Sequence, residues 1–426
     1  MEKIKKYVSK ENIWYLVIWG ALGIFILTGI FCKNLSMLNF FHSDPNDTWM
    51  DFFNSMMYKH SPYELKVIYP PLINLFYYIV HFFIADEAFA QGSLAVRASQ
   101  SGRIVISLYF IISTVLLTYG IMKLKKGDLN KKIFFVLTMI LTYPFLYLME
   151  RGNSAILCLI FLMFFIYGYK SDKKYIRHLA YISLAIAASI KIYPALFGLL
   201  IIRDKDWKGA MWAIIYGVII FFVPFVFFGG FKNIGLFIQN ILNCIDMMAD
   251  QGAGFKVSIG NAFRILEQYL GTKNSLEIVA TIFKLIILVG GSILIIFGKY
   301  KEKWKLFMVP TMIMVLIPDF SFIYSMVYFI IPLIYFLDEK SKIENRKEKI
   351  LNIIYFVLFA GMFITIPNLL PEWFEIFEND HYPLTLPTLI DNIVVVIFMC
   401  ILWVDISYFS IKKYIREKKA SKSLSK

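Results

Sequence analysis

Charged, cysteine and histidine residues are all scarce in this chain, and each shortage excludes a class of protein. Charged residues make up 17% of the 426 residues, whereas a soluble domain carries roughly 25%, so a wholly soluble fold is excluded. The four cysteines lie far apart beside apolar runs, without metal or disulfide spacing, and we interpret them as small core residues. His42, His60 and His381 are isolated, so we predict that they form no metal site; we expect no cofactor, with a divalent cation as the open alternative.

Apolar sequence, by contrast, is abundant. The chain is 59% hydrophobic and 18% aromatic, in runs of about 17–23 residues, the length that crosses a hydrocarbon core of roughly 30 Å. Because no water inside a bilayer can satisfy backbone polar groups, such runs must be helices. The first run, 14–31, is too long for a cleavable signal and is interpreted as the first span. The sequence therefore predicts an all-α polytopic transmembrane helical bundle of about 11–13 spans.

The net charge of +14 comes from Lys and Arg clusters at the ends of the apolar runs. This is the positive-inside pattern, with anionic lipid headgroups as the counter-charge, and it argues against nucleic acid as a partner. We therefore expect a multi-pass protein of the cell membrane with both termini cytoplasmic. The clusters lie at 3–10, 123–132, 170–177, 203–208, 299–305, 340–349 and in the basic cytoplasmic tail at 412–426.

The basic clusters also predict the order of the crossings. A transmembrane module is expected at 1–230, with an external first loop at 33–100. The apolar stretch 69–85 in this loop is expected to be an interfacial helix, because a crossing there would put two basic loops outside. A second external segment is expected at 231–275 and a C-terminal transmembrane module at 276–411. The spans are expected at 13–32, 101–122, 133–149, 154–169, 209–230, 276–298, 304–317, 321–337, 350–370 and 389–411.

The segment 177–202 is basic at both ends, so a single crossing would put one basic end outside. Two short helices that meet near Lys191 and Pro194 avoid this, because proline cannot continue the hydrogen-bond ladder. Broken helices are tolerated at membrane depth where they line a cavity. The tips at 150–153 and 191–194 then face the same side as the first loop, where they would form a site for an anionic donor and a hydroxyl acceptor.

Three acids in the first loop, Asp44, Asp47 and Asp51, are candidates for a general base. They stand among aromatic residues, and partial desolvation raises the pKa of a carboxylate toward the range that suits a base. Such a base would take the proton from an acceptor hydroxyl that attacks a sugar. The alternative is local: an Asx turn at Asp44 and a helix N-cap at Asp47.

Arg151 and Lys191 are candidates for binding the donor phosphate. Lys191 has largely apolar residues on both sides, and a lysine buried in this way is costly unless it is paired. A lipid phosphate would pair with it while the prenyl tail stays in the bilayer. The alternatives are an acidic partner for Lys191 and snorkelling of Arg151 to the outer headgroups.

Further residues are weaker candidates for the substrate pocket. Tyr69 precedes two prolines and could stack on a sugar ring, although a turn role fits equally well. Arg264 could help to bind phosphate, although a solvated amphipathic helix is the alternative. Asp319 marks the outer end of a helix pair and could face the cavity. The predicted pocket residues are Tyr69, Asn153, Tyr193 and Arg264.

The order of these motifs resembles that of the GT-C membrane glycosyltransferases. The resemblance covers about residues 10–340 and is closest to the bacterial family 87 glycosyltransferases, more distantly to the eukaryotic GPI mannosyltransferases. The motifs are the first-loop acids, Ser61-Pro62-Tyr63, Ile68-Tyr69-Pro70-Pro71-Leu72, Arg151-Gly152-Asn153 and Lys191-Ile192-Tyr193-Pro194.

The resemblance implies an inverting, metal-independent or weakly metal-dependent transfer of a hexose, with mannose favoured. The donor would be a polyprenyl-phosphate sugar, and the acceptor a glycolipid or glycan of the envelope on the outer face. A first-loop aspartate would be the base, here Asp47 or Asp51 with Asp44 behind them. Lys191 and Arg151 would neutralise the leaving phosphate.

One departure from the family pattern concerns the acceptor side of the pocket. Many relatives carry Ser-Trp and a His after the proline equivalent to Pro318, whereas this chain has Ser321-Phe322 and Tyr324.

Two other functions remain as alternatives. A transporter or flippase of a lipid-linked or anionic solute would be expected to show related halves and a midplane charge relay, and the sequence shows neither. A non-catalytic subunit of an envelope-assembly pathway is the second alternative. We therefore expect a hexosyltransferase.

Overall fold

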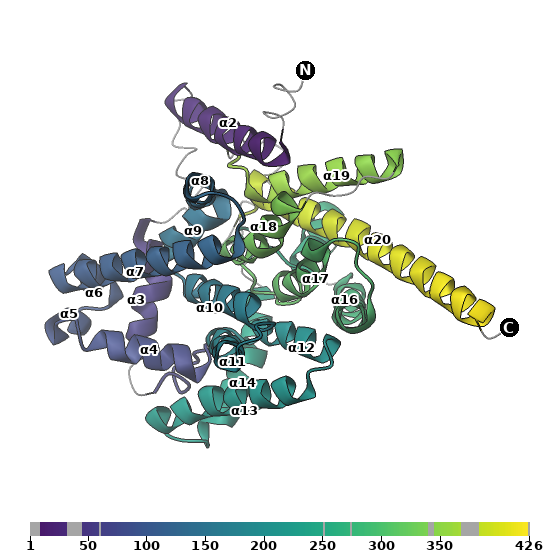
Figure 1. Ribbon diagram of the computed structural model, residues 1–426. Helices are drawn as coiled ribbons and strands as arrows, with labels where there is room; N and C mark the ends of the chain where they lie inside the picture. Colours follow the sequence, from purple (N-terminus) through teal and green to yellow (C-terminus); the bar gives the residue numbers. More distant parts are fainter. Residues whose placement is uncertain are drawn as a thin grey trace.

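The computed structural model describes residues 9–31, 45–58, 61–249, 252–272, 275–339, 345–367 and 383–424. Within these ranges all the regular elements are helices, and one isolated antiparallel bridge joins Lys256 to Phe322. The predicted all-α polytopic bundle is confirmed. In Figure 1 the helices gather into one body, from which α20 (Leu386–Leu424) extends toward the C-terminus.

The described helices of the first part of the chain precede the break at Lys191. They are α2 (Lys10–Phe31), η2 (Pro45–Asp47), α3 (Met50–Met56), α4 (Pro71–His81), α5 (Asp86–Ala90), α6 (Ser93–Ala98), α7 (Gln100–Leu124), α8 (Leu129–Ile140), α9 (Tyr143–Arg151), α10 (Ala155–Gly168) and α11 (Lys174–Ile190).

The later helices follow the break at Lys191. They are η3 (Tyr193–Gly198), α12 (Leu199–Arg203), α13 (Trp207–Phe222), η4 (Val223–Phe228), α14 (Asn233–Ala249), α15 (Ile259–Tyr269), α16 (Glu277–Phe297), α17 (Lys303–Leu316), η5 (Ile323–Phe329), α18 (Ile330–Asp338) and α19 (Arg346–Phe363).

Fewer helices than expected are long enough to cross a bilayer alone. The described ranges contain five such helices, or six if α8 and α9 together form one bent span, against the 11–13 spans predicted. The apolar segment expected as a span at 133–149 is bent, because the chain turns by 64° between α8 and α9. Pro144 lies in the first turn of α9, where a residue without an N–H is tolerated. Because proline cannot donate a backbone hydrogen bond, it cannot continue the helix that precedes it.

The break predicted near Lys191 is confirmed. Helix α11 ends at Ile190, and η3 begins at Tyr193 with Pro194 in its first turn. The backbone N–H of Lys191 donates the last bond of α11 to the carbonyl of Ala187, at 3.0 Å. The side chain of Lys191 therefore leaves the chain between two helices rather than from the middle of one.

The two segments predicted as external also contain helices. Within the predicted interfacial stretch 69–85, α4 covers Pro71–His81, and Pro71 occupies the first helical turn, as suits a residue without an N–H. The segment 231–275, expected to lie outside the bilayer, contains α14 and α15. The stretch 371–387, between the last two expected spans, lies mostly outside the described residues.

The centre of the bundle is formed by α10, α17 and the η5–α18 pair. Nearly every side chain of α17 is buried, whereas α16 on the periphery exposes Ile282, Leu285 and Val289. Exposed aliphatic residues on an outer helix suit contact with lipid. The apolar periphery and the closely packed centre therefore support a multi-pass membrane protein.

Candidate active site

A cavity of about 270 Å³ lies where the segment before α4, the end of α9, the break at Lys191 and η5 meet. Asp51, Tyr69, Arg151, Lys191 and Tyr193 line it. These residues come from sequence positions up to 142 apart, and all five were predicted as site residues. A concave site with a few converging polar groups is the usual form of a binding pocket.

Asp51 is held at both of its carboxylate oxygens. It lies in the first turn of α3, which begins after Trp49, a residue in the left-handed region with φ of 63°. Arg151 donates from Nη2 to Oδ1 at 2.6 Å, and Asn153 donates from Nδ2 to Oδ2 at 2.7 Å. Each oxygen keeps a further lone pair, so Asp51 can still accept a proton from a group in the cavity.

The other two first-loop acids are placed differently. Asp47 lies 3.7 Å from Nη1 of Arg151 through its carboxylate, and its backbone carbonyl accepts from the same nitrogen at 3.2 Å. Its side chain is 34% exposed and does not line the cavity. Asp44 lies outside the described residues. Of the acids that the structure describes in this loop, Asp51 is the one at the cavity.

The turn between α9 and α10 fixes the two groups that hold Asp51. Gly152 ends α9 with φ of 64°, a conformation that glycine adopts without strain. The Oδ1 of Asn153 accepts from the backbone N–H of Ala155 at 2.9 Å. Because that N–H can only donate, the amide oxygen must face it, and the NH₂ group must face Asp51.

The guanidinium group of Arg151 is paired with carboxylates in the structure. Its side chain is 12% exposed and contacts Asp51 and Asp47. The sequence predicted that Arg151 would neutralise the donor phosphate, and the geometry adds a second task, which is to orient Asp51. Lys191 differs, because in the described part of the chain no carboxylate lies within ion-pair distance of its ammonium group.

The remaining predicted pocket residues divide between the cavity and its surroundings. Tyr69 and Tyr193 line the cavity, and burial raises the pKa of the Tyr69 phenol, which therefore stays protonated. Asn153 acts through Asp51 rather than by lining the cavity. Arg264 lies on α15 and is not among the lining residues, so its predicted role stays a prediction. Among the described residues no cluster of three potential metal ligands occurs.

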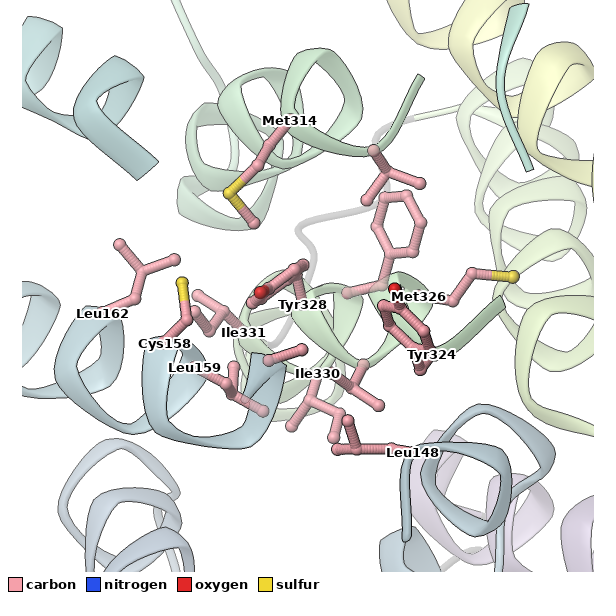
Figure 2. Packing of buried hydrophobic residues seen from close by; sticks show 14 of the residues in the cluster. Leu148, Cys158, Leu159, Leu162, Met314, Tyr324, Met326, Tyr328, Ile330 and Ile331 are labelled. Carbon is pink, nitrogen blue, oxygen red and sulfur yellow. The ribbon is translucent and has the colours of Figure 1, made fainter. Parts of the chain in front are cut away.

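Several lining residues were not predicted from the sequence. Tyr328 follows Tyr324 on η5, and Ile241 and Met314 come from α14 and α17. Figure 2 shows Tyr324 and Tyr328 on η5, with Met314 and Cys158 beside Tyr328. The spacing of the two tyrosines is a signal that the sequence offered, whereas nothing in the apolar runs marked Ile241 or Met314.

The fold and the cavity define a polytopic helical membrane protein whose charged pocket lies at a break between helices. The sequence model of glycosyltransferase family 87 matches residues 67–317, which is more than half of the chain. The chain belongs to glycosyltransferase family 87 and is therefore a membrane glycosyltransferase. No curated protein and no solved structure matches it.

The family match favours the enzyme over the transporter and the assembly subunit. It includes Tyr69, Arg151, Lys191 and Tyr193, but it begins after Asp51. The case for Asp51 therefore depends on its position beside the matched residues.

Proposed function

We propose that this protein transfers a hexose, with mannose favoured, from a polyprenyl-phosphate sugar to a glycolipid or glycan acceptor on the outer face of the cell membrane. The observation that carries the proposal is the charge of the cavity. Among the residues that the structure describes, the charged side chains that line it are Asp51, Arg151 and Lys191. Arg151 is paired with carboxylates, so the ammonium group of Lys191 is the charge that the cavity offers to a donor.

This single cationic charge favours a donor with one negative charge. The phosphodiester of a polyprenyl-phosphate sugar carries one, whereas diphosphate-linked donors carry more. An unmatched charge in a water-poor cavity is costly, so a monoanionic donor fits best. Ile192, Ile241 and Met314 add apolar lining that suits a prenyl chain.

The proposed reaction is a single displacement at the anomeric carbon. The acceptor oxygen forms a bond to C1 as the bond from C1 to the phosphate oxygen breaks, and its electron pair goes to the phosphate. The acceptor proton passes to Asp51, and the configuration at C1 inverts. A positioned general base contributes roughly 10²–10⁴-fold to such a step.

Lys191 and Arg151 have separate tasks in this scheme. Lys191 faces the leaving phosphate, which gains negative charge in the transition state, and a fixed cation stabilises that charge. Arg151 keeps the carboxylate of Asp51 correctly turned between turnovers, through the contact of 2.6 Å. No metal ion takes part in the proposed scheme.

The experiment that tests the proposal compares donors of different charge. Purified protein in lipid vesicles receives a polyprenyl-phosphate hexose, a polyprenyl-diphosphate hexose or a nucleotide-diphosphate hexose, each with a labelled sugar and an envelope lipid extract. We expect transfer or donor hydrolysis with the polyprenyl-phosphate hexose alone. Mannose, glucose and galactose donors then rank the sugars.

Two variants serve as controls. Asp51→Asn should lower transfer at least about 100-fold, whereas Asp128→Asn should leave it unchanged. Asp128 caps α8 by accepting from the N–H of Lys131 at 2.9 Å and does not line the cavity. Transfer from a nucleotide-linked donor, or full activity of Asp51→Asn, would contradict the proposal.

A further inference from the structure

The ammonium group of Lys191 is held by an aromatic ring. Its Nζ lies 5.0 Å from the ring centroid of Tyr324, within the range of a cation–π contact. Three other lysines that are buried or half-buried are paired with acids. Lys125 lies 3.0 Å from Glu11, Lys305 lies 2.7 Å from Asp405, and Lys284 lies 2.5 Å from Asp319.

The ring of Tyr324 belongs to a column of four nearly parallel rings. Tyr324 lies 5.7 Å from Phe322 with 21° between their planes, and 6.1 Å from Tyr147 with 14°. Tyr147 lies 5.5 Å from Phe255 with 3° between the planes. Phe322 and Tyr324 line the cavity, whereas Tyr147 and Phe255 are not among its lining residues. We call these four residues the aromatic column.

The backbone around the column holds these rings in place. Phe255 has φ of 59°, a conformation that costs energy for a residue other than glycine. Its N–H donates to Oγ1 of Thr388 at 3.0 Å, and its carbonyl accepts from the N–H of Ile323 at 2.9 Å. Since strained residues persist only where their surroundings determine them, the aromatic column is a rigid support.

A ring differs from a carboxylate as a partner for a phosphate-binding lysine. A carboxylate would neutralise the ammonium group, occupy its N–H donors and repel a phosphate. The face of an aromatic ring attracts the cation without neutralising it, and the N–H donors of the ammonium group stay available. The ring therefore fixes the direction of Lys191 without cancelling the charge that the cavity offers.

We propose that Tyr324, supported by the aromatic column, is the positioning residue that aims Lys191 at the donor phosphate. The inference rests on the proposed function, because it requires Lys191 to bind that phosphate. It assigns Tyr324 to the donor side of the pocket, at the position where the sequence departs from the family pattern. The part that Tyr324 contributes is its ring, since the contact is made by the ring face.

The test is a double-mutant cycle on ligand binding. Farnesyl phosphate is the probe, and its dissociation constant is measured for the full-length protein in detergent. We expect Tyr324→Leu to weaken binding about tenfold, as loss of a buried cation–π contact predicts, and Tyr324→Phe to bind as the wild type. Lys191→Met should weaken binding strongly, and adding Tyr324→Leu to it should have no further effect.

A matched control separates positioning from packing. Tyr355 is buried, and its ring lies 5.5 Å from Nζ of Lys305, but Lys305 has acidic partners and Tyr355 does not line the cavity. Tyr355→Leu should lower thermal stability and leave the dissociation constant unchanged. If the two leucine variants lose equal thermal stability, weaker binding by Tyr324→Leu alone would show that this substitution acts on the site and not through general packing.

The outcomes that overturn the inference differ from those that overturn the proposed function. Additive effects in the cycle would mean that the ring of Tyr324 acts without Lys191, and equal loss in Tyr324→Phe would mean that the hydroxyl carries the effect. Either result removes the positioning role and leaves the phosphate site intact. Unchanged binding in Lys191→Met would instead remove the phosphate site itself.

Discussion

At the scale of single residues, the orientation of its carboxylate decides whether Asp51 can act as a general base in the cavity. Asp51 is fixed by Arg151 and Asn153, and Asn153 is 1% exposed with both ends of its amide engaged. An amide in this position can turn in one way only. The direction of the free lone pairs of Asp51 therefore depends on a residue that does not line the cavity.

The first prediction follows from that dependence. Asn153→Ala removes the contact of 2.7 Å to Asp51, so the carboxylate gains freedom to rotate. We expect kcat for sugar transfer to fall roughly 10–100-fold, as a misplaced catalytic group predicts, while KM for the donor changes little. Steady-state kinetics in detergent or in vesicles measures both values.

Asn233→Ala is the control for Asn153→Ala. Asn233 is also buried and donates to the carbonyl of Phe228 at 2.6 Å, away from the cavity. Both variants should lose about 1 kcal/mol of stability, but Asn233→Ala should keep the wild-type kcat. A kcat loss of the same size in both variants would mean that Asn153 has a structural role only.

The residue types of the site could be predicted from the sequence, but their pairing could not. An acidic loop and two isolated cations marked Asp51, Arg151 and Lys191. Arg151 precedes Gly152, and the positive φ of that glycine turns the chain so that Arg151 meets Asp51 rather than the headgroups. Backbone turns of this kind are decided by tertiary contacts, which the charge pattern does not contain.

At the scale of elements, the site depends on two glycines that allow close approach. A Cβ at Gly152 would lie 3.1 Å from Cβ of Phe52, in addition to the cost of its left-handed conformation. We expect Gly152→Ala to destabilise the protein by roughly 1–2 kcal/mol and to lower transfer by displacing Arg151 and Asn153. Thermal unfolding in detergent checks the first effect.

Gly217→Ala provides the comparison for Gly152. Gly217 lies in α13, and a Cβ there would meet nothing within 4 Å. Alanine favours a helix interior over glycine, so this variant should unfold at the same or a higher temperature. A parallel loss of stability in both variants would contradict the account of the turn.

The second glycine lies against an ion pair at the rim of the cavity. Asp319 lies between the lining residues Pro318 and Phe320 and contacts Lys284 of α16 at 2.5 and 2.7 Å. A Cβ at Gly260 would lie 2.0 Å from Oδ1 of Asp319. We expect Gly260→Ala to separate the pair, move the rim and raise KM for the donor.

Lys284→Met shows whether Gly260→Ala acts by breaking the ion pair or by disturbing the packing of α15. If Gly260→Ala acts by breaking the contact between Lys284 and Asp319, adding it to Lys284→Met should have a smaller effect on KM than it has alone. Steady-state kinetics on the single and double variants measures this coupling. Full additivity would mean that the glycine matters for another contact.

At the scale of the whole molecule, the fold class could be predicted, but the number of long spans could not. Hydropathy and charge predict where the chain is apolar, and they also predicted the break at Lys191, because both ends of that segment are basic. They do not reveal whether an apolar run is straight, and the bend of 64° between α8 and α9 depends on local proline chemistry and packing. Several predicted crossings are short helices for this reason.

The orientation of the molecule leads to a further prediction. In a variant without native cysteines, a single cysteine at Asn46 should react with a membrane-impermeant maleimide in intact cells. A cysteine at Lys174 should react only after the membrane is opened. Both positions are exposed in the structure. Labelling of both positions from outside would contradict the proposed external active site.

The most direct test of a catalytic cavity that unites Asp51 and Lys191 is the single-turnover rate of sugar transfer at increasing concentrations of polyprenyl-phosphate hexose. For Asp51→Asn we predict a maximal rate at least about 100-fold lower, with the half-saturating donor concentration unchanged. For Lys191→Met we predict at least a tenfold higher half-saturating concentration, as loss of a charged contact to phosphate implies. Wild-type curves from either variant would contradict the account.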